Sequence, residues 1–344
     1  MTSVARCENL QKNILFLIEK ANVKIYALAC YSNGNKEMKI IIAKHAGFCF
    51  GVRRALDITQ EVQRKYGSKI FTLGDLVHNE EVLKDLEKKN IFSSREVPEN
   101  SIVISRAHGI SQKKKKEIKS KKNKHFDAVC PFVKKIYQAV EKNTDCLVII
   151  FGNKEHPEIQ AIVDDFPAVL VHKNANWITK KIEEKKVDHS ISESPIPDSE
   201  SRRVSASNSQ NWHQNIFILS QSTENKEEFE KFWMKIKENL PNSKFKIQNT
   251  ICSSARERQV ECAEIARKVD KMIVIGGKNS NNSRELFKVA EKIASALFIQ
   301  NENQIKKSFL ANSNTIGVTA GASTPNDLIE RCLKKIRAFK LSNP

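Results

Sequence analysis

The chain alternates short apolar, mostly β-branched runs with segments of helical spacing, and a small polar loop follows each run. Apolar strands that alternate with helices are typical of parallel sheets covered on both faces. In such sheets, ligands collect outside the carboxyl ends of the strands. The sequence therefore predicts an α/β protein with its functional residues in the loops after strands. The runs and loops are KIIIAKHAGFC, KIFTLGDLVHN, SIVISRAHGIS, CLVIIFGNKEHPE, NIFILSQST, KMIVIGGKNSNNS and NTIGVTAGASTP.

Composition excludes some classes of protein. The formal net charge is +18, but lysine dominates it, and runs such as Lys113–Lys116 are typical of solvated helix faces rather than of a nucleic-acid interface. The longest apolar runs are too short to span a membrane. The eight cysteines include no CxxC pair, which favours a reducing compartment over a disulfide scaffold, with the cytoplasm as the default. We expect neither nucleic acid nor membrane as a partner.

Three cysteines lie in unusual contexts, namely Cys49 in GFCFGV, Cys130 in FDAVCP and Cys252 in NTICSS. A fold that brings them together would offer three thiolates to a single metal centre. Three thiolates suit an iron–sulfur cluster with one open iron, or a zinc site with one open position. The other cysteines have ordinary settings.

His78, His108 and His156 each follow a strand on the expected ligand side of a sheet. Imidazolium groups there suit a phosphate or diphosphate, although a zinc site that combines them with cysteine remains an alternative. Glu158 follows His156 closely, and it could deliver protons to a ligand. Glu158 could equally be an acidic residue in the first turn of a helix.

Further polar residues lie where helices are expected to begin. Hydroxyls, side-chain amides and backbone N–H groups at helix starts form cradles for anions, although plain N-capping uses the same residues. No GxGxxG or GxxxxGK[ST] motif is present, so the sequence indicates neither a dinucleotide cofactor nor a bound nucleoside triphosphate. Any electrons must therefore come from an outside carrier. The polar residues are Ser222, Ser280, Asn281, Asn282 and Ser323.

Across about residues 38–330, these motifs together resemble the 4-hydroxy-3-methylbut-2-enyl diphosphate reductase family, an oxidoreductase family of the methylerythritol phosphate route to isoprenoids. The resemblance implies three similar parallel-sheet α/β lobes around a central iron–sulfur cluster. The chain departs from the family at Ser222, where threonine is common, and at Asn281, where serine is frequent. The matching motifs are GFCFGVRRA, LVHN, AHG, FDAVCP, HPE, SQST, ICSS, GGKNSNNS and GVTAGAS.

The resemblance also implies the chemistry. The substrate would be 4-hydroxy-3-methylbut-2-enyl diphosphate, converted to isopentenyl and dimethylallyl diphosphate with electrons from a ferredoxin or flavodoxin type of carrier. Cys49, Cys130 and Cys252 would hold a 4Fe–4S cluster, Glu158 would supply protons, and Ser222 would help to place the substrate hydroxyl. The diphosphate would bind His78, His108, His156, Ser280, Asn281, Asn282 and Ser323.

We expect the lobes to follow one another with one interruption. The first would comprise residues 51–130, the second 131–248 with a flexible polar insertion at about 173–214, and the third 38–50 with 249–330. A non-catalytic extension (1–37) and a C-terminal tail (331–344) would flank them. From the residues alone, a zinc-dependent hydrolase and a basic RNA-binding protein with structural cysteines stay open as alternatives.

Overall fold

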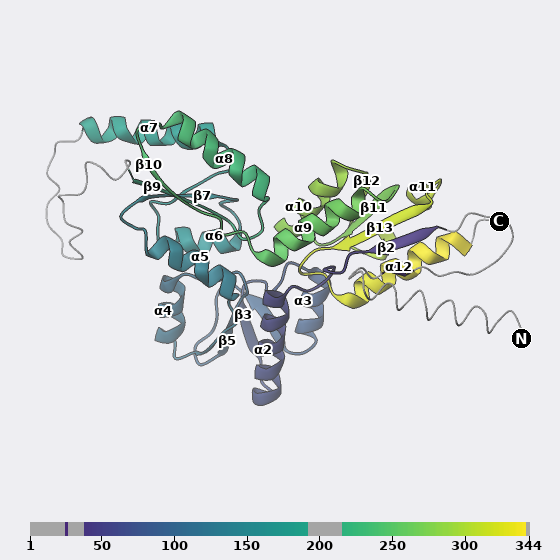
Figure 1. The fold of residues 1–344 in the computed structure, drawn as a ribbon. Coiled ribbons are helices and arrows are strands. Elements are labelled where there is room, and N and C mark those ends of the chain that lie inside the picture. Colours follow the sequence, from purple (N-terminus) through teal and green to yellow (C-terminus); the bar gives the residue numbers. More distant parts are fainter. Residues whose placement is uncertain (1–24, 27–37, 192–214, 342–344) are drawn as a thin grey trace, which may run out of the picture. The chain divides into compact units, whose positions relative to one another are not determined.

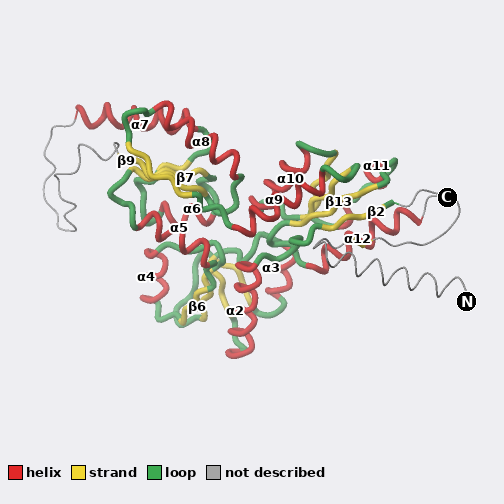
Figure 2. The backbone as a smooth tube through the Cα atoms, viewed as in Figure 1, coloured by secondary structure: helices red, strands yellow, loops and turns green. Residues whose placement is uncertain are grey.

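The computed structural model describes residues 25–26, 38–191 and 215–341. Their strands form three sheets, all parallel except for the edge pair β1 and β2 (Figures 1 and 2). The predicted class, three parallel-sheet α/β lobes, is confirmed. By their contacts, the described residues form two compact units. Within the described part of the chain, unit 1 draws on residues 25–26, 38–53, 77–88 and 253–341, and unit 2 on residues 54–76, 89–191 and 215–252.

Unit 1 contains one sheet with helices on both faces, in the strand order β1-β2-β13-β11-β12. Because side chains alternate along a strand, Ile40 and Ile42 of β2 pack toward α12, whereas Ile41 packs toward α9 and α10. Both faces are therefore buried, as apolar parallel strands require. The strands are β1 (Ile25–Tyr26), β2 (Lys39–Ile42), β11 (Lys271–Ile275), β12 (Ser295–Ile299) and β13 (Thr315–Ala320).

The helices of unit 1 follow the strand ends. The helix α12 begins a few residues after β13, and α10 begins a few residues after β11. The helix α2 (Phe50–Tyr66) starts in unit 1 directly after Cys49 and continues into unit 2. The others are α3 (Glu80–Glu87), α9 (Ser253–Ala266), α10 (Asn281–Glu291), the 3-10 helix η2 (Glu302–Gln304), α11 (Lys307–Leu310) and α12 (Asn326–Leu341).

Unit 2 contains two sheets. The first has the order β4-β3-β5-β6, and a small core that includes Val103 and Ile118 packs its helix α4 against it. The second has the order β10-β9-β7-β8 and is covered by α7 and α8 on one face and by α5 and α6 on the other (Figure 1). The elements of the first sheet are β3 (Ile70–Leu73), β4 (Ile91–Ser94), β5 (Ile102–Ser105), β6 (Lys124–Asp127) and α4 (Gln112–Ser120). Those of the second are β7 (Leu147–Phe151), β8 (Leu170–Val171), β9 (Asn215–Ser220), β10 (Lys244–Gln248), α5 (Pro131–Glu141), α6 (Pro157–Val163), α7 (Ala175–Ile191) and α8 (Lys226–Asn239).

The prediction of a flexible insertion at about 173–214 is wrong for its first part. Residues Ala175–Ile191 form α7, and Ala175, Ile178 and Ile182 enter the core of the second sheet of unit 2. Their spacing of three and four residues is that of an amphipathic helix. Burial of each isoleucine stabilises the fold by about 1.5–3 kcal/mol. These few apolar residues therefore hold the helix on the sheet although the residues around them are polar. Residues 192–214 lie outside the described part of the chain.

The predicted lobe boundaries also change. The C-terminal tail does not begin at residue 331, because α12 continues to Leu341 and buries Cys332, Leu333 and Ile336 in unit 1. Residues Val77–Lys88, expected in the first lobe, belong by their contacts to unit 1. Of the predicted extension 1–37, the structure describes only β1, which pairs antiparallel with β2, and the remainder lies outside the described residues.

None of the helices in residues 38–191 and 215–341 combines the length with the apolar composition that crossing a membrane demands.

Candidate functional site

Every predicted site residue lies in a loop, or at a helix start, that comes after the carboxyl end of a parallel strand. In unit 1, Cys49, Ser280 and Ser323 follow β2, β11 and β13, which are neighbours in one sheet. In the second sheet of unit 2, the adjacent strands β7, β9 and β10 precede the loops of His156, Ser222 and Cys252. In the first sheet, the adjacent strands β5 and β6 precede those of His108 and Cys130. The polar residues are therefore gathered at the edges where α/β sheets bind ligands.

The start of α10 forms a buried polar cradle in unit 1. Ser280 is its N-cap, and the Ser280 hydroxyl accepts a hydrogen bond from the backbone N–H of Ser283 at 3.3 Å. Asn281 and Asn282 are each only 4% exposed. Within the described residues, neither amide atom of Asn282 has a hydrogen-bond partner. A buried, unsatisfied amide at a helix N-terminus is what an anion-binding site requires.

A second contact in unit 1 joins the Ser323 loop to the His78 turn. The Ser323 hydroxyl donates to the carbonyl oxygen of His78 at 3.3 Å. Gly277 lies against the same carbonyl, because a Cβ at this position would come within 2.5 Å of the His78 oxygen. The absence of a side chain at Gly277 thus lets the loops after β11 and β13 meet the turn that carries His78.

Glu158 and Ser222 form a buried pair in unit 2. Glu158 lies in the first turn of α6 and is 1% exposed. One of its carboxyl oxygens accepts from the Ser222 backbone N–H at 2.9 Å, and the other accepts from the Ser222 hydroxyl at 2.5 Å. The sequence predicted both residues, and the structure brings them together.

Burial raises the pKa of the Glu158 carboxyl to about 7, because desolvation disfavours its charged form. The hydrogen bonds from Ser222 act in the opposite direction, and the negative charge of Glu224 adds to the rise. Near neutral pH, Glu158 is therefore present in both protonation states. A carboxyl with this pKa can donate or accept a proton at working pH, which suits general acid catalysis.

The sequence offered no expectation for Glu224. It is fully buried, and its carboxylate forms an ion pair with Lys173 at 2.5 Å. Its position two residues after Ser222 was the only available signal. Because Glu224 helps to raise the pKa of Glu158, it affects the proton chemistry of the site without belonging to a motif.

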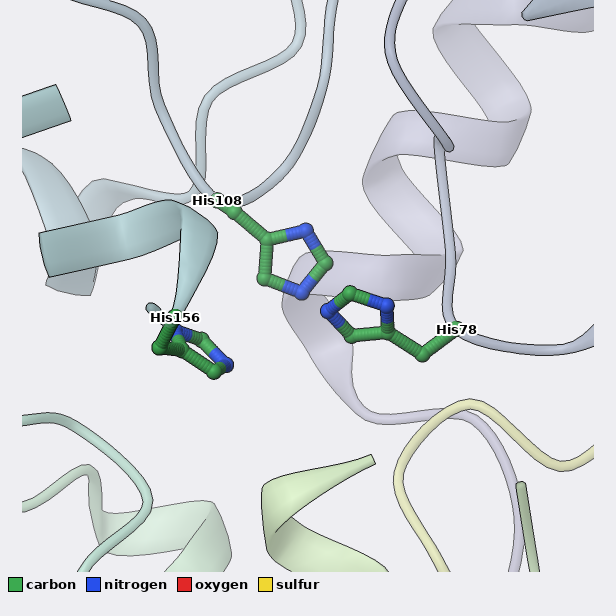
Figure 3. A group of neighbouring side chains, drawn as sticks. All are labelled: His78, His108 and His156. Atoms are coloured by element: carbon green, nitrogen blue, oxygen red, sulfur yellow. The ribbon is translucent and has the colours of Figure 1, made fainter. Parts of the chain in front are cut away.

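His108 and His156 lie side by side in unit 2, with ring centroids 5.6 Å apart in an edge-on arrangement (Figure 3). His156 is the N-cap of α6, and its Nδ1 atom accepts from the backbone N–H of Glu158 at 3.2 Å. In the neutral ring the proton is therefore on Nε2, which makes Nε2 the donor. His78, also labelled in Figure 3, belongs to unit 1.

Five of the six cysteines in the described residues divide into two groups. Cys49, Cys130 and Cys252 are half-buried thiols that follow strand ends. Cys262 and Cys332 are buried in helices, and burial raises the pKa of each thiol to about 12. A thiolate is the species that binds metals, so the two core cysteines are poor ligands. Of the three candidates, Cys130 and Cys252 belong to unit 2 and Cys49 to unit 1.

A hydrogen bond from the main-chain N–H anchors each of the three candidate cysteines to a neighbouring loop. The N–H of Cys49 donates to the carbonyl of Ala322, beside Ser323, at 3.0 Å. The N–H of Cys130 donates to Ala107, beside His108, at 3.0 Å, and that of Cys252 donates to Ser222 itself at 2.8 Å. In each lobe, a main-chain bond thus fixes a sulfur-bearing loop to a loop with a candidate substrate residue.

Arg258 of α9, which sequence reasoning missed, supports the Cys49 loop. It is 5% exposed, and its guanidinium donates to the carbonyl oxygens of Gly47 at 2.8 Å and of Ser254 at 3.0 Å. Glu261, one turn later, accepts from the backbone N–H groups of Lys44 and His45. A lone Arg or Glu within a helix carries no sequence signal for such a role.

A cavity of about 220 Å³ lies in unit 2 beside the start of α6. It is lined by His108, Glu158, Tyr137 and the ion pair of Asp127 with Lys134, whose charged atoms are 2.6 Å apart. Such a volume holds several water molecules. Water molecules therefore have space beside the start of the helix that carries Glu158.

A family model described as LytB protein matches residues 40–337. The chain is 34% identical to a 4-hydroxy-3-methylbut-2-enyl diphosphate reductase of Clostridium acetobutylicum over 318 residues, 89% of this chain and 44% of that longer relative. It is also 34% identical to the Campylobacter hominis protein of the same name, over 88% of this chain and 100% of the relative.

A solved structure of the E-1-hydroxy-2-methyl-but-2-enyl-4-diphosphate reductase from Plasmodium falciparum is similar in fold. The TM-score is 0.72 at 25% sequence identity, and the match covers 90% of this chain and 89% of that one. The similarity thus extends over most of both chains.

Proposed function

The chain belongs to the LytB protein family, and we propose that it reductively removes the hydroxyl group of 4-hydroxy-3-methylbut-2-enyl diphosphate. The products would be isopentenyl diphosphate and dimethylallyl diphosphate. One observation carries the proposal, namely that the family match, residues 40–337, includes every strand-end loop with a candidate residue. The reaction consumes two electrons and two protons for each substrate molecule and releases one water.

We propose that Cys49, Cys130 and Cys252 hold a 4Fe–4S cluster. The donor set fits, because these are the half-buried thiols at strand ends, whereas the thiols of Cys262 and Cys332 are kept protonated by burial. Held by these three thiolates, such a cluster would supply an open iron as a Lewis acid for the substrate hydroxyl and would deliver electrons one at a time. The electrons would come from a ferredoxin or flavodoxin type of carrier.

The diphosphate would bind the predicted polar residues after the strand ends. In unit 1, the unsatisfied amide of Asn282, the helix start at Asn281, and the hydroxyls of Ser280 and Ser323 supply donors. His78, His108 and His156 would add imidazole N–H groups. Anchoring a charged diphosphate at several points fixes the position of the distant hydroxyl, which lowers the entropic part of the barrier.

Protons would pass through Glu158 and Ser222. A protonated Glu158 would give its proton to the leaving hydroxyl, which departs as water, and a second proton would reach the allylic carbon. The Ser222 hydroxyl holds the carboxyl in one orientation through its 2.5 Å hydrogen bond. Its place between Glu158 and the backbone of Cys252 supports a role in positioning the substrate hydroxyl.

Ser323→Ala is expected to raise KM about tenfold with little change in kcat. This change corresponds to the loss of one hydrogen bond to a charged group. Steady-state kinetics would measure both constants, and the visible spectrum should stay unaltered. Ser313→Ala is the matched control, because Ser313 precedes the opposite end of the same strand, β13. A changed spectrum with an unchanged KM would reject the assignment of Ser323 to the diphosphate.

Metal analysis of anaerobically purified protein tests the proposal against its alternatives. The reductase is expected to be brown and to contain iron and acid-labile sulfide. A colourless, air-stable protein with zinc and no sulfide would favour a hydrolase with the same three cysteines. A colourless, metal-free protein with salt-dependent RNA affinity would favour a basic RNA-binding protein.

A further inference from the structure

Arg331 of α12 connects three separate segments of unit 1. Its guanidinium donates to both carboxylate oxygens of Glu81 at 2.6 and 2.7 Å, to Glu302 of η2 at 3.1 Å, and to Asp327 of its own helix at 2.9 Å. One guanidinium nitrogen, Nη2, makes both contacts with Glu81, and charges that form such a network can contribute measurably even at a surface.

The bond to Glu81 matters because of where Glu81 lies. It is in the first turn of α3, whose N-cap, Asn79, accepts a hydrogen bond from the backbone N–H of Val82. His78 directly precedes that cap. Residues Val77–Lys88 belong to unit 1 although both flanking chain segments belong to unit 2. The Arg331–Glu81 bond therefore holds a short excursion of the chain against α12.

The His78 turn also contacts the loops after β11 and β13. The carbonyl of His78 accepts from the Ser323 hydroxyl at 3.3 Å and lies against Gly277. A neutral hydrogen bond of this kind contributes only about 0.5–1.5 kcal/mol. The charged bond through Glu81 supplies a second point of attachment, on the first turn of the helix.

We propose that Arg331 is a positioning residue, whose paired bond to Glu81 holds the His78 turn in place for the diphosphate. The inference deepens the proposed function and rests on it. With Arg331 in place, the His78 turn is ordered before substrate arrives, and binding does not have to order it. Without it, the three carboxylates repel one another and α3 separates from α12.

The decisive variant is Glu81→Gln, which removes the charge on α3 and keeps the size of the side chain. Glu80→Gln is the matched control, because Glu80 is exposed in the same first turn and has the same relation to the helix dipole. Asp327→Asn is a second control, since Asp327 binds Arg331 without reaching α3.

For Glu81→Gln we expect KM and the Kd for inorganic diphosphate to rise about five- to tenfold, with kcat and the visible spectrum unchanged. Amide hydrogen exchange in residues 79–84 should also accelerate. Both controls should behave like the wild type. In Arg331→Lys, a single ammonium group cannot contact Glu81, Glu302 and Asp327 together, so this variant should be intermediate.

The outcomes distinguish the positioning role of Arg331 from the proposed function. If the wild type binds diphosphate and Glu81→Gln binds it equally well, the positioning role is overturned and the proposed function stands. The positioning role also fails if Glu80→Gln weakens binding as much, because any loss of negative charge at this helix start would then have the same effect. If the wild type neither binds diphosphate nor turns over substrate, the proposed function fails first.

Discussion

Glu158→Gln is expected to lose turnover by at least about a hundredfold, the lower range for removal of a general acid. An amide cannot give up a proton in the reaction, whereas it can still accept from the Ser222 backbone N–H, as the carboxyl does at 2.9 Å. The substrate should therefore bind with nearly unchanged affinity, and the visible spectrum should match that of the wild type. Single-turnover kinetics under anaerobic conditions would measure the loss. Full activity in this variant would contradict the assignment of Glu158 as proton donor.

The pH dependence of the wild type provides an independent check. With a pKa of about 7 in the free enzyme, Glu158 loses its proton as the pH rises through neutrality, so kcat/KM should fall about tenfold per pH unit above that value. The residual activity of Glu158→Gln should lack this descending limb. A wild-type profile that stays flat from about pH 6 to 9 would count against proton delivery by this carboxyl.

The pH dependence of thermal unfolding measures how Glu158 affects the stability of the fold, separately from its role in catalysis. The pKa of Glu158 is about 7 in the folded protein, above its ordinary value of 4.5, so the folded state binds more protons than the unfolded state between these values. Its contribution to stability is therefore present below about pH 4.5 and is lost as the pH rises through about 7. Glu158→Gln removes this dependence, and its Tm relative to the wild type should improve with rising pH.

Cys252→Ser is expected to lose bound iron, colour and all measurable turnover. A serine hydroxyl stays protonated and binds iron poorly, and two remaining thiolates hold a cluster weakly. The hydroxyl is small enough to keep the backbone bond from residue 252 to Ser222, so the fold should persist. Iron and sulfide assays together with circular dichroism would separate cluster loss from unfolding.

Cys146→Ser is the control for this experiment. Cys146 is also half-buried, and it lies at the start of β7 rather than after a strand end, so it should keep the full iron content. Equal iron loss in both variants would show that the assay reports general damage. Full iron content in Cys252→Ser would remove Cys252 from the proposed ligand set.

Seven strands, β2, β3, β5, β7, β9, β11 and β13, could be predicted because each is a mostly apolar run, and in a parallel sheet such runs are buried on both faces. The strands β4 (IFSS), β6 (KHFD) and β10 (KFKIQ) were not predicted, because polar residues interrupt them. The sequence segment KIIIA, for example, sends Ile40 and Ile42 to one core and Ile41 to the other. The same reasoning located the strand-end loops, since polar residues directly after such runs are conspicuous. The helix α7 was missed because Lys and Glu surround the few apolar positions that fix it in place.

The connections between loops could not be read from the sequence. The bonds from Cys49, Cys130 and Cys252 to the loops of substrate residues are made by main-chain atoms, which every residue has. The pKa of Glu158 depends on burial and on Glu224, and neither is visible before the chain is folded. Arg331 and Glu81 are separated by 250 positions, and ordinary surface charges look the same in a sequence.

The most direct test of the central claim is the reaction itself. Reconstituted protein under anaerobic conditions, supplied with a strong one-electron reductant and 4-hydroxy-3-methylbut-2-enyl diphosphate, would be followed by mass spectrometry. The account predicts isopentenyl and dimethylallyl diphosphate, with two electrons consumed for each product molecule. Unchanged substrate in the presence of a fully loaded, reduced iron–sulfur protein would contradict it.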